Sequence, residues 1–130
     1  MNHWACKYIG LPYRVGGRDF DGVDCWGLLY LVYRDEFNIH LPLMPGEDLM
    51  AKARDMARGE YEGWREVSAP QEGCAVAMSQ KELLHHVGIW VQGKIIHSWE
   101  NLRVIADTPR TLRQIRGIQI FRYFVYGLHH

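Results

Sequence analysis

The sequence predicts a single α+β domain, in which helices come first and a mostly antiparallel sheet of about five strands follows. Apolar residues recur at helical spacing in the first 58 residues, whereas after Pro70 they form short runs separated by turn signals. A chain of 130 residues has the length of one domain and can bury a core without metal or disulfide cross-links. Residues 1–130 are therefore assigned to one unit.

The helical half is divided by glycine and proline. Gly10 and Pro12 end the first apolar segment. Asp24 is a suitable N-cap for the second segment, because its carboxylate accepts hydrogen bonds from free backbone N–H groups. The expected order is a short helix at 3–9, a glycine-rich loop at 11–23, a helix at 24–37, a turn-rich connector at 41–46 and a helix at 47–58.

The second half has the pattern of a strand meander. Segments rich in β-branched and aromatic residues alternate with short turns, which predicts antiparallel pairing of neighbours. Thr108 and Pro109 are the residue types of an N-cap and a first helical position, so one or two turns of helix should precede the last strand. The expected strands are 74–78, 86–91, 94–99, 103–106 and 118–125.

Cys25 is the first candidate for chemistry. It follows the N-cap Asp24 and therefore lies in the first turn of the expected helix. Free N–H groups and the positive dipole end at such a position favour a thiolate, the nucleophilic form of cysteine. The alternative is an inert buried thiol, which is the common fate of a free cysteine. Cys6 and Cys74 are interpreted as structural.

Two histidines of the sheet are candidate partners for this cysteine. Gln92–Gly93 is a two-residue hairpin signal, and the register it sets places His86 opposite Trp99, with His97 as its diagonal neighbour. His85 would point to the other face, where a partly exposed polar residue is common. His86 is therefore the expected base and His97 its orienting partner. A three-residue turn would reverse the choice between His85 and His86.

Composition excludes several classes of function. Fifteen basic and fifteen acidic residues cancel, so no overall field points to nucleic acid or to a membrane surface. Five arginines between residues 103 and 122 face a single acidic residue in the last thirty, which fits either an anionic substrate or a solvated charged face. No window has the length of a membrane span and the amino end has no apolar signal core, so we expect synthesis in the cytoplasm.

No cofactor or metal is expected. Three cysteines are too few and too irregular for a disulfide framework and fit a reducing compartment. A Cys/His cluster can hold zinc, but Cys25, His86 and His97 lack the close paired spacing of zinc-ribbon or zinc-finger ligands.

Taken in order, the motifs resemble those of the NlpC/P60 cysteine peptidases. The resemblance covers about residues 3–125, and the ordered combination of motifs is more specific than any one of them. It departs from the family at two positions, since Trp26 stands where Ser is usual and Cys74 where Asp is common. The matching segments are Tyr8–Gly17, Asp24–Gly27, Gln71–Val76, His86–Val91 and Ile95–His97.

The resemblance implies a papain-like fold, with N-terminal helices packed on the sheet, and cleavage of peptidoglycan stem peptides. It further implies a phage-tail or prophage branch, because of Trp26 and the helix that follows it, with phage tail-tip proteins as possible partners. The implied roles are nucleophile for Cys25, base for His86, orienter for His97, oxyanion contact for Tyr13, and substrate contacts for Asp24 and Trp26. For Asp24, capping of the helix is the competing role.

Two other functions use the same fold. The chain could be a catalytically silent tail or assembly protein, although a scaffold has no need of Cys25, His86 and His97 together. It could also use the Cys/His pair for acyl transfer instead of hydrolysis. Purified cell wall and mass spectrometry of the released peptides separate all three hypotheses.

Overall fold

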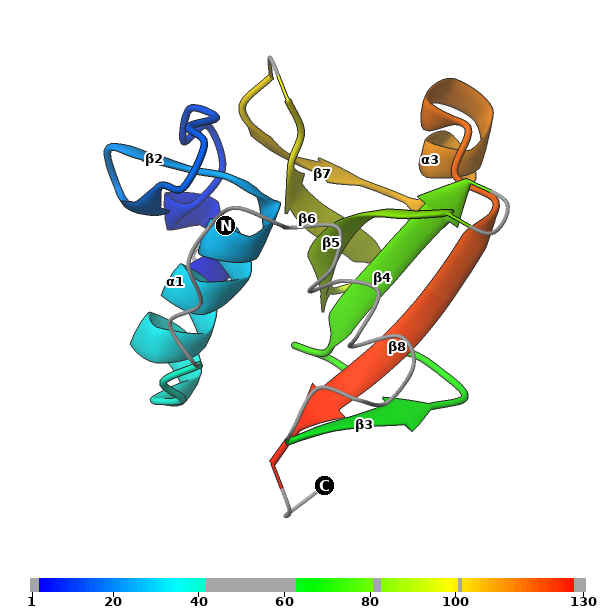
Figure 1. Ribbon diagram of the computed structural model, residues 1–130, viewed down its shortest axis with the longest axis horizontal. Coiled ribbons are helices and arrows are strands. Elements are labelled where there is room, and N and C mark those ends of the chain that lie inside the picture. The colour runs from blue at the N-terminus through cyan, green and yellow to red at the C-terminus, as the bar shows by residue number, and fades with distance from the viewer. Residues whose placement is uncertain (1–2, 42–62, 81–82, 101, 128–130) are drawn as a thin grey trace.

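The structure is a computed structural model that describes residues 3–41, 63–80, 83–100 and 102–127 (Figure 1). The expected helix at 47–58 lies outside these ranges, as does the connector at 41–46 apart from Leu41. Within the described ranges, no helix combines the length and the apolar character that crossing a membrane requires.

The helix that begins at Cys25 is confirmed. Helix α1 (Cys25–Phe37) has Asp24 as its N-cap and ends at Asn38, whose φ of 55° is left-handed. The expected helix at 3–9 is instead a four-residue 3-10 helix, η1 (Trp4–Lys7). The short helix after Thr108 is confirmed as α3 (Pro109–Arg116), with the Thr108 side chain accepting from the Thr111 backbone N–H.

In the described part of the chain six strands form one sheet, and each neighbouring pair in it is antiparallel. Their spatial order is β3-β8-β4-β5-β6-β7, so the last strand along the chain lies between β3 and β4. The strands are β3 (Trp64–Val67), β4 (Ala75–Gln80), β5 (Leu83–Val91), β6 (Lys94–Ser98), β7 (Val104–Asp107) and β8 (Ile120–Tyr126).

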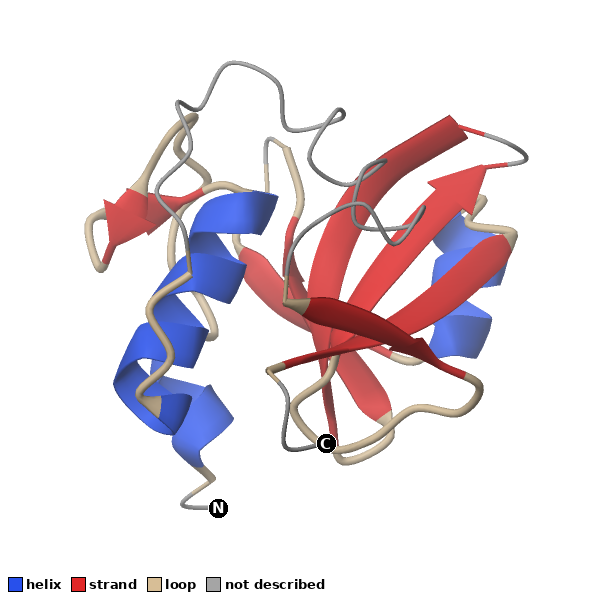
Figure 2. Ribbon diagram, turned by 60° about the horizontal axis from the view of Figure 1, so that its bottom comes forward, coloured by secondary structure: helices blue, strands red, loops and turns tan. Residues whose placement is uncertain are grey.

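The prediction of about five strands, with the N-terminal helices as the layer packed on the sheet, is therefore wrong in two respects. Strand β3 was missed because Arg65 and Glu66, both exposed, interrupt its apolar pattern. The second α-helix described, α3, comes late in the chain and lies on the other side of the sheet from α1 (Figure 2). The glycine-rich loop also contains a two-strand ribbon, β1 (Arg18–Asp19) with β2 (Gly22–Val23).

Alternating side chains of the sheet bury two hydrophobic clusters. On β4, Ala75 and Ala77 join the cluster that packs with α1, whereas Val76 and Met78 join the cluster that contains Leu112 of α3. This period of two is what a strand buried on both faces requires. Helix α1 itself packs against β5 and β6, which brings its first turn to the strands that carry the histidines.

The predicted hairpin register is confirmed. Val91 pairs with Lys94, and the ladder continues to Ile89 and Ile96. Gln92 and Gly93 have φ values of 50° and 81°, and positive φ at both central residues is typical of a two-residue hairpin turn.

Candidate active site

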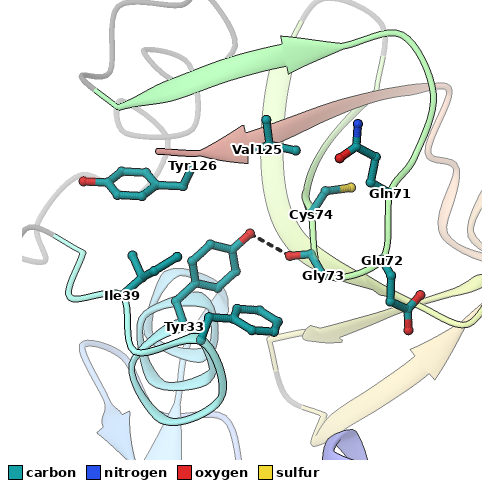
Figure 3. A pocket seen from close by; sticks show the side chains of 9 residues that line it. Tyr33, Ile39, Gln71, Glu72, Gly73, Cys74, Val125 and Tyr126 are labelled. Carbon is teal, nitrogen blue, oxygen red and sulfur yellow. Dashed lines mark hydrogen bonds between the residues drawn. The ribbon is translucent and has the colours of Figure 1, made fainter. Parts of the chain in front are cut away.

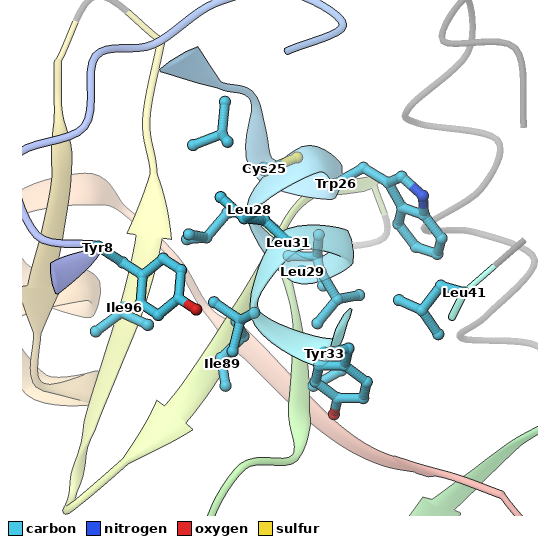
Figure 4. Packing of buried hydrophobic residues seen from close by; sticks show 14 of the residues in the cluster. Tyr8, Cys25, Trp26, Leu28, Leu29, Leu31, Tyr33, Leu41, Ile89 and Ile96 are labelled. Carbon is cyan, nitrogen blue, oxygen red and sulfur yellow. The ribbon is translucent and has the colours of Figure 1, made fainter. Parts of the chain in front are cut away.

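The Cys25 thiol lies at the start of α1 (Figure 4), the helix that packs against strand β5. The side chain is buried, with 8% of the residue exposed, and the backbone N–H groups of Val87 and Trp26 act to lower the pKa of the thiol. The Val87 contact places the thiol beside the residue that follows His86 along β5. The structure thus relates Cys25 to Val87, a residue far from it in the sequence.

Asp24 fixes the backbone around this thiol. One of its carboxylate oxygens accepts from the Gly27 N–H at 2.7 Å and the other from the Gly16 N–H at 2.7 Å. Asp24 is buried, and buried polar groups need hydrogen-bond partners. The two backbone N–H groups supply a partner for each carboxylate oxygen. Capping accounts for this carboxylate, and its predicted contact with substrate stays a prediction.

Gly17 and Gly27 allow the backbone of the loop and the backbone of α1 to approach each other closely. A Cβ atom on Gly27 would lie 1.8 Å from the carbonyl oxygen of Gly17, so α1 could not begin this close to the loop with any larger residue. The loop and the helix start are thereby held in direct contact.

Tyr13 lies next to the nucleophile candidate. It forms a bridge with Val23, two residues before Cys25. Burial raises the pKa of the Tyr13 hydroxyl, and the negative charges of ionised Cys25, Asp24 and Glu100 raise it further. The predicted oxyanion role of Tyr13 stays a prediction.

His86 and His97 are in direct contact. Nε2 of His86 lies 2.9 Å from Nδ1 of His97, and the two rings are nearly perpendicular with centroids 5.0 Å apart. The rings of Trp99 and His86 pack edge to face, with centroids 4.8 Å apart. His86, His97 and Trp99 therefore share one face of the sheet, as predicted. The side chain of His97 is fully buried, which excludes solvent from this contact.

Sequence reasoning missed two further residues at this site. Asp107, the last residue of β7, has its Oδ2 2.9 Å from Nε2 of His97. The guanidinium of Arg116, from α3, lies over the ring of Trp99 at 5.4 Å. For Asp107 the available signal was its position directly after a predicted strand. For Arg116 it was membership of the arginine-rich segment.

Residues 10–118 match the NlpC/P60 family, which is well over half of the chain and includes each of these side chains. The chain belongs to the NlpC/P60 family.

Relatives of known name and structure agree with this assignment. Murein DD-endopeptidase MepH of Escherichia coli (strain K12) is 34% identical over 115 residues, covering 85% of this chain and 35% of that protein. The chain therefore spans about a third of the length of that relative.

Two solved structures share the fold. The NlpC/p60 domain of the peptidoglycan hydrolase SagA superposes with a TM-score of 0.61 at 23% identity, covering 92% of this chain and 91% of that one. An NlpC/P60 family protein from Bacillus cereus ATCC 10987 also superposes with a TM-score of 0.61 at 23% identity. This match covers 88% of this chain and 35% of that one. At this identity the likeness is one of fold.

In this NlpC/P60 domain, burial disfavours the charged forms of both Cys25 and His86. Burial is the largest influence on Cys25 and, with Asp24, raises the pKa of the thiol from 9.0 to about 12, although three backbone N–H groups oppose the shift. That rise corresponds to roughly 4 kcal/mol against ionisation. Burial, His97 and Arg116 hold the pKa of His86 well below its ordinary value. The expected thiolate at the helix start is therefore outweighed by desolvation.

The raised pKa gives a test by titration. Because the thiolate forms only as the pH approaches about 12, its population at pH 7 is about 10⁻⁵. The difference in thiolate ultraviolet absorbance between the parent and Cys25→Ala should be absent at neutral pH and appear above pH 10. Cys6→Ala, which removes an exposed cysteine, is the control. A Cys25-dependent thiolate signal at pH 7 would show that the site rests as an ion pair.

Trp26 and Cys74 are both buried. Trp26 belongs to the core and is turned toward Leu41 (Figure 4), and its predicted substrate contact stays a prediction. Cys74 lines a separate hollow at the far end of α1, where Tyr33 donates a hydrogen bond to the Gly73 carbonyl (Figure 3). No histidine is among the described residues that line this hollow.

The ring nitrogens of the site histidines have other side chains as partners. Within the described ranges, no cluster of three or more His, Cys, Asp or Glu side chains is arranged to hold a metal ion. The facing nitrogens of His86 and His97 contact each other, and the remaining ring nitrogen of His97 contacts Asp107.

Proposed function

We propose that this chain is a cysteine endopeptidase that hydrolyses an amide bond in peptidoglycan stem peptides. The observation that carries the proposal is a buried His86 that contacts His97, on the strand β5 against which α1 packs with Cys25 in its first turn. Membership of the NlpC/P60 family and the name of the Escherichia coli relative supply the substrate class.

The proposed reaction is acyl transfer through a thioester. His86 accepts the Cys25 proton as the sulfur attacks the carbonyl carbon, so a neutral pair becomes charged only as the bond forms. The Cys25 backbone N–H and the Tyr13 hydroxyl would stabilise the oxyanion. His86 then protonates the leaving amine, and water, deprotonated by the same imidazole, releases the acid and restores the thiol.

Two bonds are candidates for cleavage. The family resemblance favours the bond between D-glutamate and the diamino acid within one stem. The relative named as a DD-endopeptidase favours a bond between D-configured residues, as occurs in peptide cross-links. We propose the first as the principal site, and the two bonds can be distinguished because an uncross-linked stem contains no cross-link to cut.

The test uses purified protein with three substrates: intact sacculi, soluble monomeric muropeptides and cross-linked dimers. Mass spectrometry should detect a new amine terminus on the diamino acid in the monomers, with slower release from sacculi. Cleavage of dimers to intact monomers would identify the cross-link bond instead. New amide products without hydrolysis would indicate acyl transfer. If no substrate changes while Cys25 remains open to alkylation, the domain is a silent scaffold and the proposal fails.

The biological setting is a further proposal. The Trp26 form of the nucleophile motif supports a phage-tail or prophage origin, with the domain made in the cytoplasm and reaching the wall within a particle or after lysis. Recognition of the wall would then come from the cleft or from a tail-tip partner. Immunogold labelling of purified particles tests this association.

A further inference from the structure

A continuous line of hydrogen bonds runs from Asp107 through His97 to His86. Oδ2 of Asp107 lies 2.9 Å from Nε2 of His97, and Nδ1 of His97 lies 2.9 Å from Nε2 of His86. His97 is fully buried and His86 nearly so, which prevents water from exchanging these partners. Each contact must therefore be satisfied by one donor and one acceptor.

The carboxylate end of this line fixes the direction of every bond. An ionised carboxylate only accepts, so the hydrogen between Asp107 and His97 is on Nε2 of His97. A neutral imidazole carries one hydrogen, which leaves Nδ1 of His97 as an acceptor. The hydrogen in the second contact then belongs to Nε2 of His86, and Nδ1 of His86 is left with a free lone pair.

Protonation of the pair is consistent with that assignment. Burial lowers the pKa of His97 more than Asp107 raises it, and burial lowers the pKa of His86 together with His97 and Arg116. Both rings are neutral at pH 7, because each imidazole takes up its second proton only below its lowered pKa. Neither ring then has a second hydrogen that would reverse the order of donors.

We infer that Asp107 is a positioning residue that fixes the tautomers of both histidines and thereby makes Nδ1 of His86 the atom that accepts the Cys25 proton. This inference rests on the proposed function for its catalytic consequence. During attack the S–H bond of Cys25 breaks and an N–H bond forms at Nδ1 of His86. The Nε2 hydrogen of His86 stays bonded to its nitrogen and donates to His97, so the new positive charge faces a line that ends in a carboxylate.

The position of Asp107 in the fold suits this role. In the β6–β7 ladder His97 pairs with Ile105 and Ile95 pairs with Asp107, so Asp107 is a diagonal neighbour of His97. The next residue, Thr108, caps α3, so the strand ends at the carboxylate. The nearby cation, Arg116, lies over Trp99 and lowers the pKa of both histidines, opposing the charge that Asp107 supplies.

An amide at position 107 would no longer fix which atom donates and which accepts in each hydrogen bond. Asn is close in size to Asp, but its NH₂ group can donate to Nε2 of His97. His97 would then carry its hydrogen on Nδ1, His86 would have to accept at Nε2, and Nδ1 of His86 would bear the hydrogen. A base in that tautomer cannot take the thiol proton at Nδ1.

The test begins with ¹⁵N NMR of the imidazole nitrogens in the full chain, assigned with His86→Gln and His97→Gln. In the parent at pH 7, Nε2 of both rings should be protonated and Nδ1 of both unprotonated. Asp107→Asn should add the reversed tautomer, whereas the matched Asp35→Asn, at an exposed carboxylate on α1, should not. Protonated Nδ1 in parent His97, or unchanged tautomers in a folded Asp107→Asn, overturns the inference.

Kinetics on muropeptides supply the second readout. Asp107→Asn should lower kcat by about 10–100-fold with little change in KM, the range found when the partner that orients a metal-bound histidine is lost. Asp107→Glu should recover part of the rate by restoring an acceptor-only group. Loss confined to KM, or equal loss in Asp107→Glu and Asp107→Asn, contradicts the role. Because the NMR arm needs no substrate, a parent that cuts no cell-wall peptide but shows the expected tautomers disproves the function and leaves this inference standing.

Discussion

Cys25→Ala is expected to abolish turnover, with a fall of about 10⁵-fold or more in kcat, because loss of a nucleophile leaves only the residual effects of binding. The thiol is the group that forms the bond to the carbonyl carbon, and no second cysteine lines the described site: Cys6 is exposed and Cys74 lies in the separate hollow. The rate is followed as new amine termini released from soluble muropeptides.

Cys6→Ala is the matched control, since it removes a thiol of the same chain at an exposed position and should retain near-parental activity. Cys25→Ser should fold with a similar melting temperature yet remain inactive, because the hydroxyl is a far weaker nucleophile. Full activity in a folded Cys25→Ala protein would eliminate Cys25 as the nucleophile.

His86→Ala is expected to lower kcat by about 10²–10⁴-fold, the range for loss of a general base. The effect follows from the neutral resting pair, because a thiol with a pKa of about 12 needs a base to release its proton at pH 7. His97→Ala should fall between the parent and His86→Ala, since it leaves the base in place but without its hydrogen-bond partner.

His85→Ala provides the matched control for this histidine. It changes the adjacent residue of the same strand, and the hairpin register predicts a rate within a few-fold of the parent. An inactive His85→Ala together with an active His86→Ala would reverse the assignment of the base.

Local rules predicted the parts of this site that depend on short-range geometry. Capping residues located the start of α1 to the residue, since Asp24 does accept from the Gly27 N–H. A two-residue turn fixed the β5–β6 register, from which the His86–His97 contact followed by the period of two alone. These features involve residues close together in sequence or linked by one tight turn.

Features that depend on the assembled layers were not predictable in the same way. The partnership of Asp107 with His97 requires the register of a second strand pair, whose connection has no two-residue turn signal. The raised pKa of Cys25 follows from burial against β5, which opposes the helix-start effect read from local sequence. Strand β3 pairs with β8 across a long stretch of chain, and its exposed Arg65 and Glu66 conceal the pattern.

The place of β8 in the sheet has a consequence for when activity can first arise. On β4, Met78 pairs with His86 on one side and with Phe121 of β8 on the other, so the strand beside the base is braced by a segment synthesised more than thirty residues later. Until β8 leaves the ribosome, β3 and β4 lack the strand that joins them. Such non-local pairing is slow to form. A nascent chain would therefore present Cys25 well before the sheet that holds His86 is complete.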